Sequence, residues 1–135
     1  MATKIGVDTV IFIYLLEDRG ARAERAERLL KDVEQGEAEA VFSSIGVVEI
    51  LTGPKRLGRE DLVARYKEYL AHFPHLTIAG INERIVDFAS DLRARYRIRT
   101  PDAIHIATAL DFGAEKFFTN DKGLRKIKEI SVEII

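Results

Sequence analysis

Four acidic residues stand at positions where a parallel sheet would bring them together. Asp8 ends the first apolar run, Asp121 follows a later one, and Glu49 lies in a helical segment after another. Asp102 is in the first turn of a further predicted helix. Singly, each acid could be structural, in a turn or at a helix start, where the helix dipole favours a carboxylate. Together they would repel one another unless protons were shared or a cation were bound.

The surroundings of two of these acids favour a site. Glu49 interrupts the apolar segment 45–51, and a lone carboxylate there must face solvent or a charged partner. Asp102 stands at the start of the nearly uncharged segment 101–110, whose small residues suit close packing against a sheet. Carboxylate ligands without His or Cys favour Mg²⁺ or Mn²⁺. The predicted chemistry is metal-assisted hydrolysis of a phosphodiester bond.

Composition limits the class of protein. The 135 residues predict one domain spanning residues 1–135. With 21 basic and 22 acidic residues, the net charge of −1 argues against a protein that coats DNA through bulk positive charge. The absence of Cys excludes disulfides, thiolate zinc sites and a cysteine nucleophile. The longest apolar run, 10–16, is far shorter than the roughly 20 residues of a membrane span, and the first residues lack a signal pattern, so we expect a cytoplasmic protein without membrane association.

Alternating strand and helix patterns predict how the acids are positioned. Strands are predicted at 4–7, 38–43, 76–79, 116–119 and 132–135. Helices are predicted at 10–18, 22–35, 44–51, 59–73, 83–96, 100–112 and 122–128. We expect Ser44 and Thr100 to cap their helices and Gly53-Pro54 to end the third. Strands separated by helices imply an α/β fold, a three-layer α/β/α sandwich with a mostly parallel central sheet. Such sheets bind ligands at the carboxyl ends of their strands.

Four segments resemble, in order, the motifs of the PIN-domain nucleases, and most closely those of the VapC-type toxins of prokaryotic toxin–antitoxin pairs. The resembling segments are 8–17, 43–51, 92–105 and 117–122. The match runs along nearly the whole chain and implies a PIN-like fold. It also implies that the catalytic, metal-binding acids are Asp8, Glu49, Asp102 and Asp121.

The resemblance further implies an activity and partners. It implies a Mg²⁺- or Mn²⁺-dependent endoribonuclease in which a metal-activated water hydrolyses the phosphodiester bonds of an RNA substrate such as tRNA or rRNA. Toxins of this kind usually form homodimers. They are silenced by a cognate antitoxin whose C-terminal segment enters the acidic groove.

One position departs from the family pattern. Two residues after the first Asp the family usually carries Asn or Ser, whereas this chain has Val10. We therefore expect a hydrogen bond near the acids to be missing or moved, with Thr9, Thr119 and Asn120 as the polar groups that support the metal ligands. The departure keeps open a non-catalytic PIN-like module that binds RNA or protein without turnover. Phosphoryl transfer through Asp8 is disfavoured, because it needs a second Asp at position 10.

Two basic runs adjoin the proposed site. One is the segment 93–99, which contains four Arg and no acid, and the other begins at Lys122. They could contact RNA phosphates beside the metals, or they could be solvated helix ends, where basic residues suit the dipole. Arg99 is favoured for RNA contact because it lies closest to Asp102, with Arg93 and Lys122 as further candidates.

His105 lies one helical turn after Asp102, on roughly the same face. It could be a general acid or could support the metal ligands. A His in a helix of small residues is more often a hydrogen-bonded packing residue, so that role is favoured.

Overall fold

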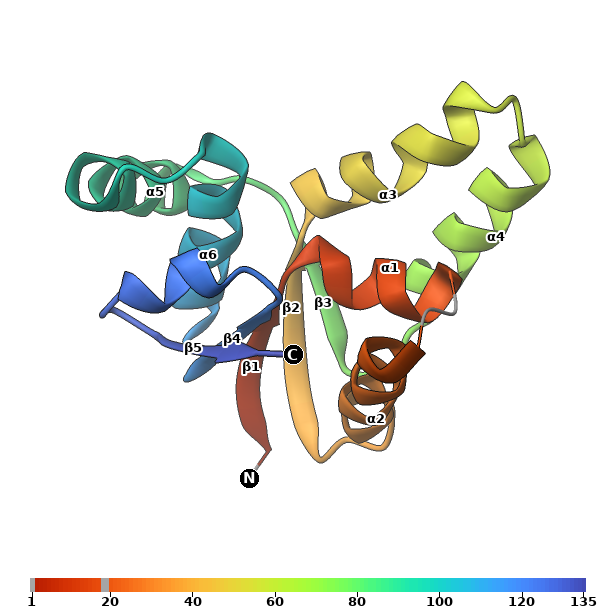
Figure 1. Cartoon of the computed structure of the whole chain (residues 1–135), viewed down its shortest axis with the longest axis horizontal. Helices are drawn as coiled ribbons and strands as arrows, with labels where there is room; N and C mark the ends of the chain where they lie inside the picture. Colours follow the sequence, from red (N-terminus) through yellow and green to blue (C-terminus); the bar gives the residue numbers. More distant parts are fainter. Residues whose placement is uncertain (1, 18–19) are drawn as a thin grey trace.

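The central layer of the protein is a five-stranded sheet with the strand order β3-β2-β1-β4-β5 (Figure 1). The computed structural model describes residues 2–17 and 20–135. The strands are β1 (Thr3–Val7), β2 (Ala38–Ser43), β3 (Leu76–Ala79), β4 (Lys116–Thr119) and β5 (Ser131–Ile134). All four strand pairs are parallel. The predicted parallel sheet is therefore confirmed.

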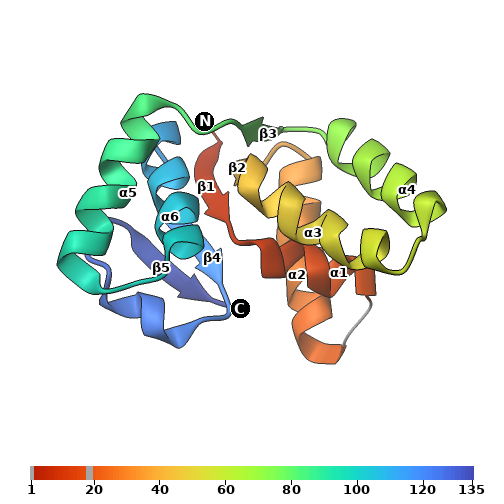
Figure 2. The same ribbon diagram turned by 90° about the horizontal axis from the view of Figure 1, so that it is seen from above.

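Helices cover both faces of the sheet, as Figure 2 shows from above. One face carries α1 (Thr9–Glu17), α2 (Gly20–Glu34), α3 (Ser44–Arg56) and α4 (Glu60–Ala71). The other carries α5 (Glu83–Tyr96), α6 (Thr100–Phe112) and the short 3₁₀ helix η1 (Lys122–Lys126). The predicted three-layer α/β/α sandwich is thus confirmed.

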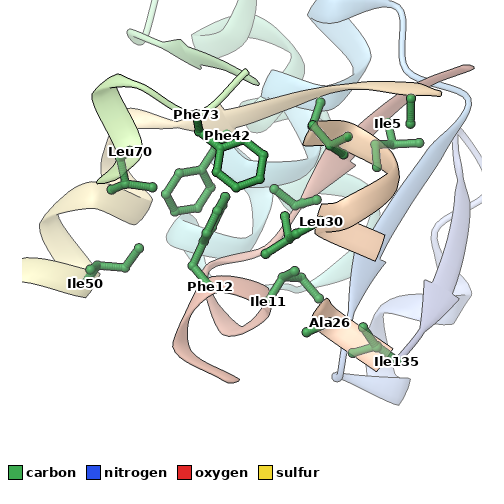
Figure 3. Close-up of a cluster of buried hydrophobic side chains, with 14 residues drawn as sticks. Ile5, Ile11, Phe12, Ala26, Leu30, Phe42, Ile50, Leu70, Phe73 and Ile135 are labelled. Atoms are coloured by element: carbon green, nitrogen blue, oxygen red, sulfur yellow. The ribbon is translucent and has the colours of Figure 1, made fainter. Parts of the chain in front are cut away.

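Two hydrophobic clusters hold the layers together. The first, between the sheet and α1–α4, includes Phe12 and Phe42, whose ring centroids are 4.8 Å apart (Figure 3). The second, between the sheet and α5–α6, includes Phe117 and Ile106. Val41 belongs to the second cluster and its neighbour Phe42 to the first, because successive side chains of a strand point to opposite faces.

Small residues let α6 approach the sheet closely. Gly6 on β1 faces Ala109 on α6, and a Cβ atom at position 6 would overlap the Ala109 methyl group. Ala103 and Ala107 on the same helix are fully buried. This close packing brings the start of α6 toward the carboxyl end of β1.

The helix predicted for 44–51 extends further than expected. It was predicted to end at Gly53-Pro54, but α3 continues to Arg56. Pro54 has no N–H to donate, so one intrahelical hydrogen bond is lost there. The N–H of Leu57 still bonds the Gly53 carbonyl at 3.2 Å and closes the last turn. A proline so near the end of a helix therefore does not stop it.

Both predicted capping residues are wrong by one position. Ser43, not Ser44, is the N-cap of α3, and its hydroxyl accepts the N–H of Ile45 at 3.2 Å. Arg99, not Thr100, is the N-cap of α6, and its side chain makes no capping hydrogen bond. In each case the predicted cap has already adopted the helical conformation, and the preceding residue is the extended one.

The remaining element ends differ slightly from the prediction. The predicted end of the first helix at Asp18 lies outside the described residues. Helix α4 ends at Ala71 rather than Phe73, because the residue before Pro74 is disfavoured in the helical region. The helix predicted for 122–128 is a single 3₁₀ segment. Within residues 2–17 and 20–135, no helix is long and apolar enough to cross a membrane.

Candidate active site

Asp8 is fixed at the carboxyl end of β1 by hydrogen bonds from two sides. Its Oδ1 accepts the backbone N–H of Thr9 at 2.8 Å, and its Oδ2 accepts the hydroxyl of Thr119 at 2.7 Å. Thr119 is the buried last residue of β4. Because β1 and β4 pair in parallel, their carboxyl ends lie side by side and the two side chains meet.

The Asp8 carboxylate carries a charge that its surroundings do not fully offset. Burial raises the pKa of Asp8 above its ordinary value of 3.8, and the charge of Asp102 raises it further. The charge of His105 and the hydrogen bonds from Thr119 and Thr9 lower the pKa, but the net shift is upward. A cation at this place would stabilise the ionised carboxylate.

Glu49 meets residues of two other helices through its Oε1 atom. That oxygen accepts the hydroxyl of Thr9 at 2.8 Å and lies 2.9 Å from Nε2 of His105. His105 Nε2 is also 3.1 Å from Thr9 Oγ1 and 3.9 Å from Asp8 Oδ1. Helices α1, α3 and α6 therefore converge on one imidazole.

His105 combines packing with these polar contacts. The residue is buried, and its ring stacks on Phe42 with centroids 6.0 Å apart and an interplanar angle of 18°. The sequence favoured a hydrogen-bonded packing role. Its one-turn spacing from Asp102 was the available signal that it also faces the acids.

Asp102 is paired with a neighbouring arginine. Arg99 Nε lies 3.2 Å from Asp102 Oδ2, and the hydrogen bond and charge of Asp102 raise the pKa of Arg99. The charges of Glu49 and Asp121 act in the same direction, so both carboxylates lie within electrostatic reach of this guanidinium. Arg99, proposed from the sequence as an RNA contact, therefore stands among three of the four acids.

Asp121 is linked to Asp8 through Thr119. The backbone N–H of Asp121 donates to Thr119 Oγ1 at 3.2 Å, while the Thr119 hydroxyl donates to Asp8. Asp121 is also the N-cap of η1, where its Oδ1 accepts the N–H of Gly123 at 2.8 Å. Its side chain is exposed, so its second carboxylate oxygen is open to a ligand.

Three other residues proposed from the sequence lie around this centre. Asn120 donates to the hydroxyl of Tyr14 at 2.9 Å and ties the end of β4 to α1. Arg93 Nε donates to the carbonyl of Ile98 at 3.1 Å, which stabilises the connection between α5 and α6. Lys122 is exposed at the start of η1, next to Asp121.

Val10 supplies no polar group to the site. It is partly buried and packs against the first hydrophobic cluster. The hydroxyl near the acids on α1 comes instead from Thr9, which bonds Glu49.

The donor chemistry of the site fits a hard divalent cation. The four acids offer oxygen ligands, and the partly buried charge of Asp8 favours a cation. In the part of the chain that the structure describes, no three Asp, Glu, His or Cys side chains are close enough to form a ligand set as they stand. The bonds of Glu49 to His105 and of Asp102 to Arg99 occupy two of the acids. Each of these bonds engages one carboxylate oxygen, and the acids must draw closer together before their other oxygens can share a metal.

The model of the PIN domain family matches residues 5–130, so this chain belongs to the PIN domain family. A parallel sheet with acids just after β1 and β4 and in the helix that follows β2 agrees with this assignment. The family predicted from the four sequence motifs is confirmed. A comparison with curated protein sequences gave no match.

Solved structures of similar fold come from toxin–antitoxin pairs. A toxin–antitoxin complex from Klebsiella pneumoniae is 25% identical, with 96% of this chain and 95% of that chain covered and a TM-score of 0.72. DNA-bound VapBC from Salmonella typhimurium is 18% identical, with 99% of this chain and 98% of that chain covered and a TM-score of 0.75. VapC20 from Mycobacterium tuberculosis is a toxin that cleaves the sarcin-ricin loop. It is 19% identical, with 95% of this chain and 98% of that chain covered and a TM-score of 0.68. The predicted likeness to VapC-type toxins is confirmed.

Proposed function

We propose that this chain is a divalent-metal-dependent endoribonuclease and the toxin of a VapBC-type toxin–antitoxin pair. The observation that carries the proposal is the grouping of Asp8, Glu49, Asp102 and Asp121 at one end of the sheet of a PIN domain. The raised pKa of the partly buried Asp8 supports a cation there. Similarity to a toxin that cleaves ribosomal RNA supports RNA as the substrate.

Each residue of the site has a role in this proposal. The four acids would hold Mg²⁺ or Mn²⁺, which when bound activates a water and offsets charge on the scissile phosphate. Thr119 and the Thr9 N–H orient the Asp8 carboxylate. Lys122, and Arg99 once it leaves Asp102, offer positive charge to the phosphates that flank the cleaved bond.

A pocket beside the site supports the proposed antitoxin. It has a volume of about 220 Å³ and lies between α1, α3 and α4. Two acids, Glu17 and Glu49, line it together with apolar residues such as Leu16, Leu57 and Tyr66. Such a pocket suits a peptide segment with apolar side chains and a basic group. We propose that a cognate antitoxin binds here and that the toxin is a homodimer. We also propose that the toxin acts in the cytoplasm on tRNA or rRNA.

Cleavage of cellular RNA by the purified protein tests the proposed activity. Reactions contain Mg²⁺, Mn²⁺ or a chelator, and Asp102→Asn serves as the control for contaminating nuclease. Asp87→Asn is the matched control, because Asp87 is an exposed acid on α5. We expect discrete fragments that require both the metal and Asp102 and that persist in the Asp87 variant.

The opposite result would favour the other function class. Binding of RNA without cleavage, in any metal, would support a non-catalytic PIN-like module. Cleavage that survives both chelation and Asp102→Asn would come from a contaminating nuclease or from groups other than the acids, and would not support the proposal.

A further inference from the structure

The Nε2 atom of His105 lies between two of the proposed metal ligands. It is 2.9 Å from Glu49 Oε1 and 3.9 Å from Asp8 Oδ1. Thr9 donates its hydroxyl to the same Glu49 oxygen at 2.8 Å, so Oε1 receives both contacts. Among the hydrogen bonds of the described residues, none involves Oε2 of Glu49. One oxygen of this carboxylate is thus held by the protein, and the other is available to a ligand.

The environment of the ring indicates which nitrogen carries the hydrogen. Nδ1 of His105 is buried and finds no hydrogen-bond partner in residues 2–17 and 20–135. A buried N–H without an acceptor is costly. We therefore assign a hydrogen to Nε2, where Glu49 Oε1 is the near acceptor and Thr9 Oγ1, at 3.1 Å, is the second; a neutral and a protonated ring both provide it.

The ring is held so that this N–H cannot turn away. The side chain of His105 is buried, and its ring stacks on Phe42, which is fully buried. Gly46, one turn before Glu49 in α3, leaves room for this arrangement, because a methyl group there would overlap the Phe42 ring and lie 2.9 Å from Thr9 Oγ1. Three helices thus fix the direction of one hydrogen bond.

We infer that His105 is a positioning residue, whose Nε2–H holds Glu49 Oε1 and so directs Glu49 Oε2 toward the space beside Asp8. This inference rests on the proposed function and deepens it, because it adds a residue to the same site. A group that orients a metal ligand typically changes metal affinity or activity by about 10- to 100-fold when it is removed. A residue that only packs would lower thermal stability and leave both properties unchanged.

NMR of the imidazole nitrogens tests the hydrogen bond without metal or RNA. The chain has three His, and the signals of His105 are those that disappear in His105→Gln. We expect long-range ¹H–¹⁵N spectra to show the hydrogen on Nε2, with a shift that changes in Glu49→Gln. An Nε2 that carries no hydrogen would overturn the inference, whatever the activity of the protein.

A variant series tests the positioning role. His105→Leu removes the N–H at similar volume, and His105→Gln keeps an amide N–H at similar reach. Thr108→Val is the matched control, because Thr108 is a buried polar residue of α6 whose hydroxyl donates to the carbonyl of Ile104 in its own helix. Circular dichroism establishes folding, electron paramagnetic resonance measures Mn²⁺ affinity, and single-turnover cleavage gives the rate at saturating metal.

The expected pattern separates this inference from the proposed function. We expect His105→Leu to lose about 10-fold or more in Mn²⁺ affinity, His105→Gln to regain most of it, and Thr108→Val to match the wild type. If the wild type binds Mn²⁺ and the variants change its affinity as expected, but the wild type cleaves no RNA, the positioning role stands and the nuclease function falls. If the wild type cleaves RNA while His105→Leu keeps its affinity and rate, only the positioning role falls. A wild type that binds no Mn²⁺ would overturn both.

Discussion

Substitution of Gly46 by Ala should destabilise the protein, although Ala is the better helix former. Gly46 lies in the interior of α3, where a methyl group would overlap the edge of the Phe42 ring. The Phe42 ring cannot easily move away from such a methyl group. Phe42 is fully buried and packs against Phe12 with ring centroids 4.8 Å apart, and on its other side it stacks on His105.

Two opposing energies set the size of the effect. Ala gains about 1 kcal/mol over Gly in a helix interior. Forcing an extra methyl group into a packed core costs about 1–3 kcal/mol, and the rigid surroundings of Phe42 place this site at the upper end. We expect the free energy of unfolding to fall by about 1–2 kcal/mol, which lowers Tm by roughly 3–8 °C for a domain of this size.

Thermal unfolding followed by circular dichroism measures this difference. Gly80→Ala is the control, because nothing lies within 4 Å of a methyl group there and the backbone needs no positive φ. It should be neutral or stabilising by up to about 1 kcal/mol. Displacement of Thr9 in Gly46→Ala should also slow RNA cleavage. A Gly46→Ala variant as stable as the wild type would refute the tight packing around Phe42.

Three further perturbations have expected outcomes. The pKa of Asp8 is raised in the folded protein, so the ionised carboxylate lowers the free energy of unfolding of the metal-free protein at pH values above that pKa. Unfolding measured at a series of pH values should show this destabilisation shrinking as the pH falls toward 3.8. Asp8→Asn should remove the penalty and raise Tm at pH 7. Arg99→Gln should tighten Mn²⁺ binding, measured by calorimetry, because a cation that competes for Asp102 is lost; weaker binding would contradict this. Val10→Asn should lower stability by about 1 kcal/mol in urea titrations without abolishing cleavage, since Val10 packs on the core.

Much of the fold follows from local patterns. Amphipathic periods and strand-like runs identify every strand of the sheet, and their alternation implies parallel pairing. The exceptions occur where local signals conflict with the rest of the structure. Pro54 signals a break, yet α3 continues because only one hydrogen bond is lost. Ser44 and Thr100 have the side chains of capping residues, but each lies within the first turn.

The sequence could place the candidate acids at one edge of the sheet, but it could not show their contacts. Asp8, Glu49 and Asp121 could be placed because strand ends of a parallel sheet share one edge. The bonds of Arg99 to Asp102 and of Asn120 to Tyr14 depend on side-chain directions, which spacing along the chain does not determine. For the same reason, the sequence could place His105 on the face of Asp102 but could not show that it reaches Glu49.

The hydrogen bond between Thr119 and Asp8 has a consequence for how activity arises during synthesis. It joins residues 111 positions apart and depends on the pairing of β1 with β4. Contacts so distant in the chain form slowly, because a long loop must close before they contribute any stability. Strand β1 can pair with β2 early, whereas β4 is made near the end. A nascent chain can therefore build part of its core on the ribosome before the candidate site exists, because Asp8 gains its Thr119 partner only after β4 has been made.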